Sequence, residues 1–166
     1  VISKETAYQM LSILEGTVQR GTAKKLRDLN VPLAGKTGTT NDNFDAWFLG
    51  FSPDLVVGVF TGFDEPQTLG PREQGASVAV PIFRDFMAKA LEGRPDIPFR
   101  IPGGVRLVRI DASTGQLASD LSEEVILEAF RPGTEPTAAE AAVLDSQTGG
   151  LLKNRATTGS GVGGLY

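Results

Sequence analysis

The stretch AGKTGTT, residues 34–40, decides the fold, and it leads directly into the aromatic run FDAWFLGF, residues 44–51. Residues 33–39 are mostly small and lie between Pro32 and Asn41, which predicts a short strand. The sequence TNDN at 40–43 is typical of a tight turn. A strand that carries one lysine, followed by a turn and a second strand, is therefore the expected centre of the domain.

Two further strands are expected around this turn. Residues 45–51 and 55–63 are rich in apolar and aromatic side chains, and Ser-Pro-Asp at 52–54 separates them. This order predicts three successive antiparallel strands. Because both alternating sets of side chains in 55–60 are mostly apolar, we expect these strands to be covered on both faces. Trp47 and Phe48 are likewise expected to pack in the core.

One helix is expected before the three strands in the chain and another after them. Apolar residues recur at helical spacing over residues 4–20, Ser3 can cap the helix, and Glu5 falls in its first turn. Residues 22–32 are polar and basic and predict a connecting loop. A second helix is expected over residues 77–92, with Pro81 acceptable in its first turn. The predicted fold class is α+β, an antiparallel sheet packed by helices.

The chain divides into three parts by composition. Residues 1–93 hold the helices and the three strands. Residues 94–133 begin with a Pro- and Gly-rich linker and predict a small β extension with strands at 105–110 and 125–130. Residues 134–166 have few large apolar side chains, so burial there cannot offset the entropy of ordering, and we expect a disordered tail.

Composition excludes several kinds of chemistry. The 166 residues include no Cys and no His, which removes Ser-His-Asp and Cys-His catalysis and zinc sites built on those ligands. The formal net charge of −4 and the lack of a basic block argue against nucleic acid as a partner. No apolar run reaches the roughly 18 residues that suggest a transmembrane helix. We expect no cofactor and no metal. The start at Val1, without Met, indicates a piece of a longer protein.

The lysine of the first stretch allows two interpretations. Gly-Lys-Thr at 35–37 can end a phosphate-binding P-loop, which requires a glycine five residues before the glycine of this triplet and a helix directly after it. The required glycine position holds Asn30, Pro32 falls inside the loop, and turn and strand residues come after Thr40. The P-loop interpretation therefore fails.

The other interpretation is a strand that binds an extended peptide. A strand edge offers amide and carbonyl groups to such a substrate, and Lys36 adds positive charge. The hydroxyls of Thr37 and Thr39 share one face and can bind a carboxylate, while Gly38 leaves room between neighbouring elements. The amide of Thr39 can serve in an oxyanion hole. Lys-Thr-Gly alone is a weak signal, and taken by itself it is better explained as an ordinary polar strand edge.

The flanking sequence favours the peptide-binding interpretation. The run AGKTGTTNDNFDAWFLGFSPDLVVGVFTGFD, residues 34–64, closely resembles the C-terminal part of the transpeptidase domain of class A (bifunctional) penicillin-binding proteins. ISKETAYQMLSILEGTVQRGTA at 2–23 resembles the family's segment before that motif. VPIFR at 80–84 resembles its final helix, and IPGGVRLVRIDASTGQLA at 101–118 resembles the extension after the domain. The resemblance covers residues 1–136.

The resemblance implies a role for each residue of the motif. Lys36 would be the motif lysine, against the catalytic hydroxyls. Thr37 and Thr39 would bind the carboxylate of the substrate or of a β-lactam, with the Thr39 amide in the oxyanion hole. Gly38 would provide space, Thr40 would correspond to a second threonine, and Gly75 would lie in a loop that borders the cleft.

The chain departs from the family in lacking its nucleophile. No Ser-x-x-Lys occurs, since Ser3, Ser12, Ser52 and Ser77 have no lysine three residues later, and Ser52-Pro53-Asp54 is better explained as a turn than as the family's Ser-x-Asn motif. The chain alone is therefore expected to be inactive.

By resemblance, the parent would be a serine-type D,D-transpeptidase that cross-links peptidoglycan stem peptides. Its partners would be the D-Ala-D-Ala donor, an amine acceptor, β-lactam antibiotics and the rest of the parent chain. The parent would lie on the periplasmic side of the bacterial inner membrane, with a membrane anchor and a glycosyltransferase domain upstream. A D,D-carboxypeptidase or serine β-lactamase, which share the motif, and a non-catalytic scaffold module remain the alternatives.

Overall fold

The computed structural model describes residues 1–137, 143–144 and 151–152. The chain forms two compact units, Val1–Val105 and Arg106–Tyr166. The first unit carries the strand with the lysine motif.

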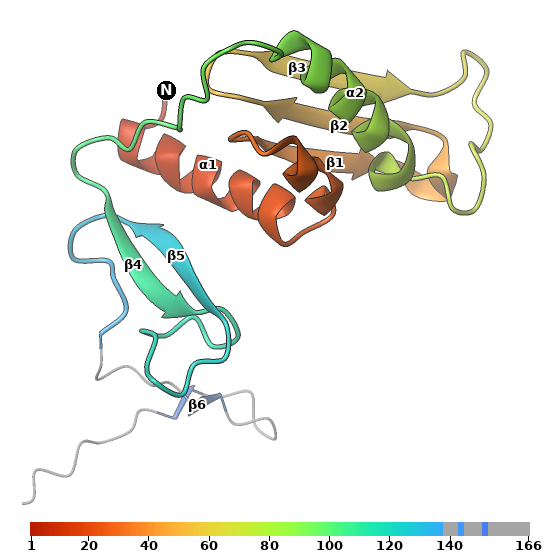
Figure 1. Cartoon of the computed structure of the whole chain (residues 1–166). Coiled ribbons are helices and arrows are strands. Elements are labelled where there is room, and N and C mark those ends of the chain that lie inside the picture. Colours follow the sequence, from red (N-terminus) through yellow and green to blue (C-terminus); the bar gives the residue numbers. More distant parts are fainter. Residues whose placement is uncertain (138–142, 145–150, 153–166) are drawn as a thin grey trace, which may run out of the picture. The chain divides into compact units, whose positions relative to one another are not determined.

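Three antiparallel strands form the sheet of the first unit, as the sequence predicts. They are β1 (Ala34–Thr39), β2 (Ala46–Phe51) and β3 (Val56–Thr61), in the order β1-β2-β3 (Figure 1). The turn from β1 to β2 contains the short 3₁₀ helix η2 (Asn41–Asn43), in which Asp42 and Asn43 have φ values of 58° and 54°. Asx residues tolerate this left-handed conformation better than most side chains, which explains why the TNDN turn forms here.

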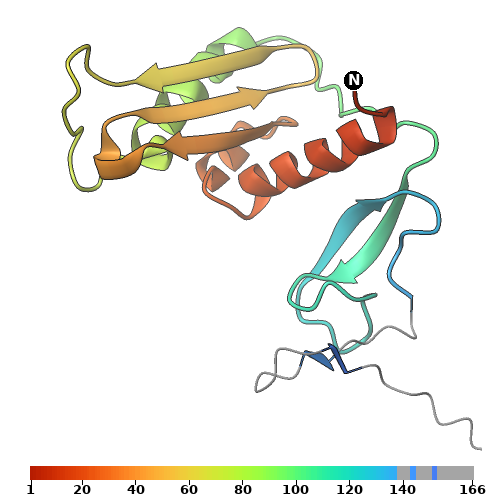
Figure 2. The same ribbon diagram turned by 180° about the vertical axis from the view of Figure 1, so that it is seen from behind.

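Helix α1 (Lys4–Gln19) agrees with the prediction to within one residue at its end. The Ser3 hydroxyl accepts a hydrogen bond of 3.2 Å from the N–H of Thr6, which caps the helix as expected. The buried residues of α1 are Tyr8, Gly16 and Val18. The helix lies alongside β1 in both views (Figures 1 and 2).

Helix α2 (Val80–Ala90) covers one face of the sheet, in front of β2 and β3 in Figure 1. It is shorter than expected because residues 77–79 belong to the π-helical segment η3 (Gly75–Ala79) and the helix ends at Ala90. Pro81 does lie in its first turn. Phe83 and Met87 are fully buried and pack in one cluster with Phe48 of β2. The rings of Phe48 and Phe83 meet edge to face, with their centroids 4.8 Å apart.

The expectation that both faces of the strands are covered is wrong. Trp47, Leu49, Val56 and Phe60 lie on the face away from α2, and they are 46–68% exposed. Figure 2 views the sheet from this side, with α2 behind the strands. Phe48 is buried as predicted, but Trp47 is not in the core. Apolar composition shows that a face favours burial; it does not show which part of the chain buries it.

The predicted loop over residues 22–32 is partly helical. Residues Lys24–Leu29 form the 3₁₀ helix η1, with the Leu26 side chain fully buried in the same core as Phe83. One buried leucine in a polar stretch anchors this segment beside α2. The sequence did not predict this helix, because charged side chains surround Leu26 in the chain.

The second unit contains β4 (Arg106–Asp111) and β5 (Val125–Phe130), which pair antiparallel as the sequence predicts for the small β extension. The strands β6 (Val143–Leu144) and β7 (Leu151–Leu152) also pair. The predicted disordered tail over residues 134–166 falls mostly outside the described residues, and within that stretch the pairing of β6 with β7 is the regular structure described.

Candidate functional site

The main-chain groups of β1 alternate between β2 and the other edge of the strand. The N–H of Thr40 bonds to the carbonyl of Asp45 at 3.1 Å, so Thr40 faces β2. In an antiparallel ladder the main-chain groups of every second residue point the same way. The N–H and C=O groups of Gly38 and Lys36 therefore also point toward β2. The N–H and C=O groups of Thr37 and Thr39 therefore point to the opposite edge. No strand pairs with that edge in the described part of the chain.

The side chains of β1 alternate between the two faces of the sheet. Thr37 is the cross-strand neighbour of Phe48, so it lies on the face covered by α2 and η3. Lys36 is opposite Leu49 and shares the uncovered face with Trp47. Thr37 and Thr39 thus share one face, as predicted, and the lysine side chain starts from the other face.

The lysine nevertheless reaches the open edge. The Lys36 Nζ atom donates a hydrogen bond of 2.9 Å to the main-chain carbonyl oxygen of Thr37, which points to that edge. The Lys36 side chain is exposed. A positive charge therefore lies beside the unpaired main-chain groups of β1.

Both threonine hydroxyls have hydrogen-bond partners. The Thr37 Oγ1 atom lies 3.0 Å from the Oγ1 of Thr22, and the Thr39 Oγ1 accepts a hydrogen bond of 3.0 Å from the N–H of Gly75. Each hydroxyl still has a lone pair, and that of Thr39 also has its proton to donate. Thr22 was not predicted as a site residue, because a lone threonine in a polar loop has no distinguishing pattern.

Gly75 packs closely against the strand ladder. A Cβ added to it would fall 2.5 Å from the carbonyl oxygen of Trp47 and 2.7 Å from that of Gly38. Only glycine lets η3 approach the strands this closely. Gly75 therefore supports the motif strand from the covered face.

Gly38 has its open side on the uncovered face. A Cβ there would lie 3.2 Å from the Cβ of Trp47, a tight contact at the level of the motif. The absence of a side chain at Gly38 leaves room next to Trp47 on the face that Lys36 shares.

The Thr40 hydroxyl closes the turn after β1. It accepts a hydrogen bond of 2.8 Å from the N–H of Asp45 and lies 3.5 Å from the carbonyl of the same residue. Beyond it lies an open hollow of about 580 Å³, lined by Thr39, Thr40, Asn41, Phe44, Asp45, Phe63 and Pro66. The end of the motif strand thus borders a hollow, while Lys36 and Thr37 lie outside it.

The first 88 residues match the family model described as the penicillin-binding protein transpeptidase domain. The chain belongs to this family. Residues 101–140 match a second model, the C-terminal domain of penicillin-binding protein 1A. The fold prediction and the resemblance to penicillin-binding proteins are thereby confirmed.

Individual penicillin-binding proteins are similar over most of the chain. Penicillin-binding protein 1A of Rickettsia bellii is 47% identical over 124 residues, which is 75% of this chain and 15% of that protein. The Pseudomonas aeruginosa protein of the same name is 42% identical over 137 residues, 82% of this chain and 17% of that protein. This penicillin-binding protein chain spans about a sixth of the length of these relatives.

A solved structure has the same architecture. The crystal structure of penicillin-binding protein 1A from Haemophilus influenzae superimposes with a TM-score of 0.72 at 33% identity, covering 82% of this chain and 22% of that chain. Among the described residues, no helix has the length and apolar character needed to cross a bilayer.

Proposed function

We propose that this chain supplies the substrate-binding strand of a serine D,D-transpeptidase that cross-links peptidoglycan stem peptides. The observation that carries the proposal is the open edge of β1, where the N–H groups of Thr37 and Thr39 and the Lys36 ammonium meet. An extended peptide can pair with such an edge as an added strand.

In this proposal the substrate is a peptide that ends in D-Ala-D-Ala. Its terminal carboxylate binds the hydroxyls of Thr37 and Thr39 in the field of Lys36. A serine outside this chain attacks the penultimate carbonyl, and the Thr39 N–H stabilises the negative charge that develops on the carbonyl oxygen. The terminal D-alanine leaves, and an amine from a neighbouring stem peptide then takes the acyl group from the serine.

Gly38, Gly75 and Thr40 have supporting roles in this proposal. Gly38 keeps the substrate surface free of side chains, Gly75 allows η3 to brace the strand, and the Thr40 hydroxyl fixes the turn that ends it. β-Lactams would acylate the same serine, with their carboxylate in place of the substrate's. We propose an extracytoplasmic location, where peptidoglycan is found.

The test is acylation of the intact protein that carries this chain. Lys36→Met removes the ammonium but keeps an unbranched side chain, and labelling by a fluorescent penicillin should slow by about 100-fold or more, the usual effect of removing one electrostatic contact to a transition state. Lys89→Met, at an exposed lysine in the last turn of α2, is the matched control and should label at the normal rate. Normal labelling of the Lys36 variant would exclude the proposed role.

A further inference from the structure

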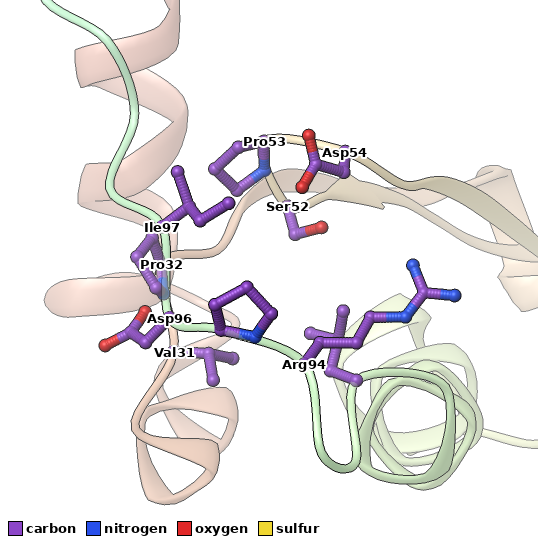
Figure 3. Close-up of a pocket in the computed structure, with 10 residues that line it drawn as sticks. Val31, Pro32, Ser52, Pro53, Asp54, Arg94, Asp96 and Ile97 are labelled. Atoms are coloured by element: carbon purple, nitrogen blue, oxygen red, sulfur yellow. The ribbon is translucent and has the colours of Figure 1, made fainter.

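A small pocket lies behind the turn between β2 and β3, near the start of β1. It has a volume of about 70 Å³, and three prolines from different segments form part of its wall (Figure 3). The other lining residues are Val31, Ser52, Asp54, Leu91, Arg94, Asp96 and Ile97. The transpeptidase site proposed above uses none of these residues.

The wall of this pocket contains a buried hydroxyl, that of Ser52, without a hydrogen-bond partner among the described residues. The residue is 7% exposed, its Oγ atom is buried, and that atom has no hydrogen-bond partner among the described residues. The main-chain N–H of Ser52 bonds to the carbonyl of Leu55 at 2.9 Å, so the turn holds the side chain in position. Figure 3 shows this side chain directed into the space between the turn and the segment at 94–97. A buried hydroxyl without a partner is destabilising, so its presence favours a ligand that bonds to it.

The charges at the rim limit the kind of ligand. Asp54 comes from the turn and Arg94 from the opposite wall, so an acceptor and a donor flank the Ser52 hydroxyl. Within the part of the chain that the structure describes, neither side chain forms an ion pair, and the Asp96 carboxylate is turned away from Ser52 in Figure 3. An acceptor and a donor together suit a neutral group that both donates and accepts. A single charge on the ligand would be repelled by one side of the rim.

The size of the pocket and its apolar walls further limit which ligand it can bind. The volume is room for roughly two water molecules, or for a group of a few heavy atoms. Val31, Leu91 and Ile97 supply apolar surface next to the polar groups. We propose that this pocket binds an amide: its N–H donates to Asp54, its oxygen accepts from Arg94, and the Ser52 hydroxyl completes the set. The amide belongs either to an Asn or Gln side chain or to a peptide main chain.

Methyl NMR of the intact protein tests the proposal, with labels on Val31, Leu91 and Ile97. Acetamide represents the side-chain amide, N-methylacetamide the main-chain amide, and acetate is the charged control of similar size. We expect saturable shifts of these methyl signals with one or both amides and none with acetate. Binding of acetamide alone assigns the site to Asn or Gln side chains, and binding of N-methylacetamide assigns it to a peptide main chain.

Variants separate the pocket from non-specific effects. Ser52→Ala should weaken amide binding by about fivefold, the scale of one net hydrogen bond, and Arg94→Met should weaken it similarly. Arg72→Met, at an exposed arginine in the loop before η3, should leave binding unchanged. Equal or tighter binding of acetate, amide binding that survives Ser52→Ala and Arg94→Met, or no saturable shift with either amide would each overturn the proposal. The last result would leave a pocket that holds only water.

Discussion

The N–H of Gly75 donates a 3.0 Å hydrogen bond to the hydroxyl of Thr39, which ties the start of η3 to the last residue of β1. The two residues are 36 positions apart in the sequence. The contact holds η3 against the end of β1 on the covered face of the sheet. The position of the Thr39 N–H, which the proposed mechanism uses, thus depends on a glycine outside the motif.

Gly75→Ala should therefore destabilise the protein and impair the motif strand. The added Cβ would meet two carbonyl oxygens at 2.5 and 2.7 Å, so η3 must move away from the sheet. We expect a loss of about 1–3 kcal/mol in the free energy of unfolding, typical of overpacking, and slower labelling by penicillin. Gly103→Ala is the control, because a Cβ there has no neighbour within 4 Å. Unchanged unfolding and labelling of the Gly75 variant would contradict the packing described.

Thr37→Val should slow acylation in the intact protein by about tenfold or more, because a hydrogen bond to the charged carboxylate is lost. The hydroxyl of Thr37 also bonds to that of Thr22, so the loss needs a control. Thr22→Val removes the bond between the two hydroxyls but keeps the Thr37 hydroxyl for the substrate. Rates of labelling by fluorescent penicillin should be near normal for Thr22→Val. Equal slowing of both variants would show that acylation depends on the hydrogen bond between Thr22 and Thr37, and not on a bond from Thr37 to the substrate.

The 166-residue chain expressed alone should not be labelled by fluorescent penicillin, whereas the intact protein should be. The reason is that the proposed nucleophile lies outside this chain, which contains no Ser-x-x-Lys sequence. Gel fluorescence after incubation of both proteins at equal concentration measures the difference. A covalent adduct on the short chain, located by peptide mass, would refute this account.

The uncovered sheet face should respond differently to mutation from the covered face. Phe48 is fully buried, so Phe48→Ala should cost about 3–5 kcal/mol of unfolding free energy. Leu49 is the next residue and 57% exposed, so Leu49→Thr in the 166-residue chain should cost much less and reduce binding of a hydrophobic dye. Denaturant unfolding and dye fluorescence measure the two effects. A cost for Leu49→Thr as large as that for Phe48→Ala would mean that this face is buried.

The ion pair between Asp28 and Arg84 should make a small, pH-dependent contribution to stability. Arg84 donates from Nε at 3.2 Å and from Nη2 at 2.8 Å to Asp28 Oδ2, and these hydrogen bonds lower the pKa of Asp28. Because the folded pKa is lowered, the contribution is complete above the ordinary carboxyl pKa and is lost as the pH falls through the lowered value. Asp28→Asn should therefore lower the unfolding temperature slightly at about pH 7, and this difference should shrink as the pH falls below the ordinary carboxyl range. Salt should reduce the difference at neutral pH, since both groups are solvent-exposed. A difference that persists in acid would exclude the ion pair as its cause.

Local patterns in the sequence predict the elements that depend on neighbouring residues. The cap at Ser3, the period of α1 and the turn at 40–43 each act over a few residues, and all three agree with the structure. The strands β2 and β3 are predicted by apolar runs separated by a turn, and β1 by a short run of small residues between Pro32 and Asn41. The short connections predict their antiparallel order. The motif and its flanks also identify the family, because several separate segments match together.

Tertiary structure alone decides which neighbours each side chain meets. Apolar alternation in 55–60 does not reveal that α2 covers one face only, and a polar stretch does not reveal that Leu26 is buried. The contacts from Gly75 to Thr39 and from Thr22 to Thr37 join residues 36 and 15 positions apart, so no local pattern encodes them. The sequence by itself determined a lysine-bearing strand of a transpeptidase family. The packing of η3 and α2 decided which face is covered, because burial depends on the neighbours that folding brings together.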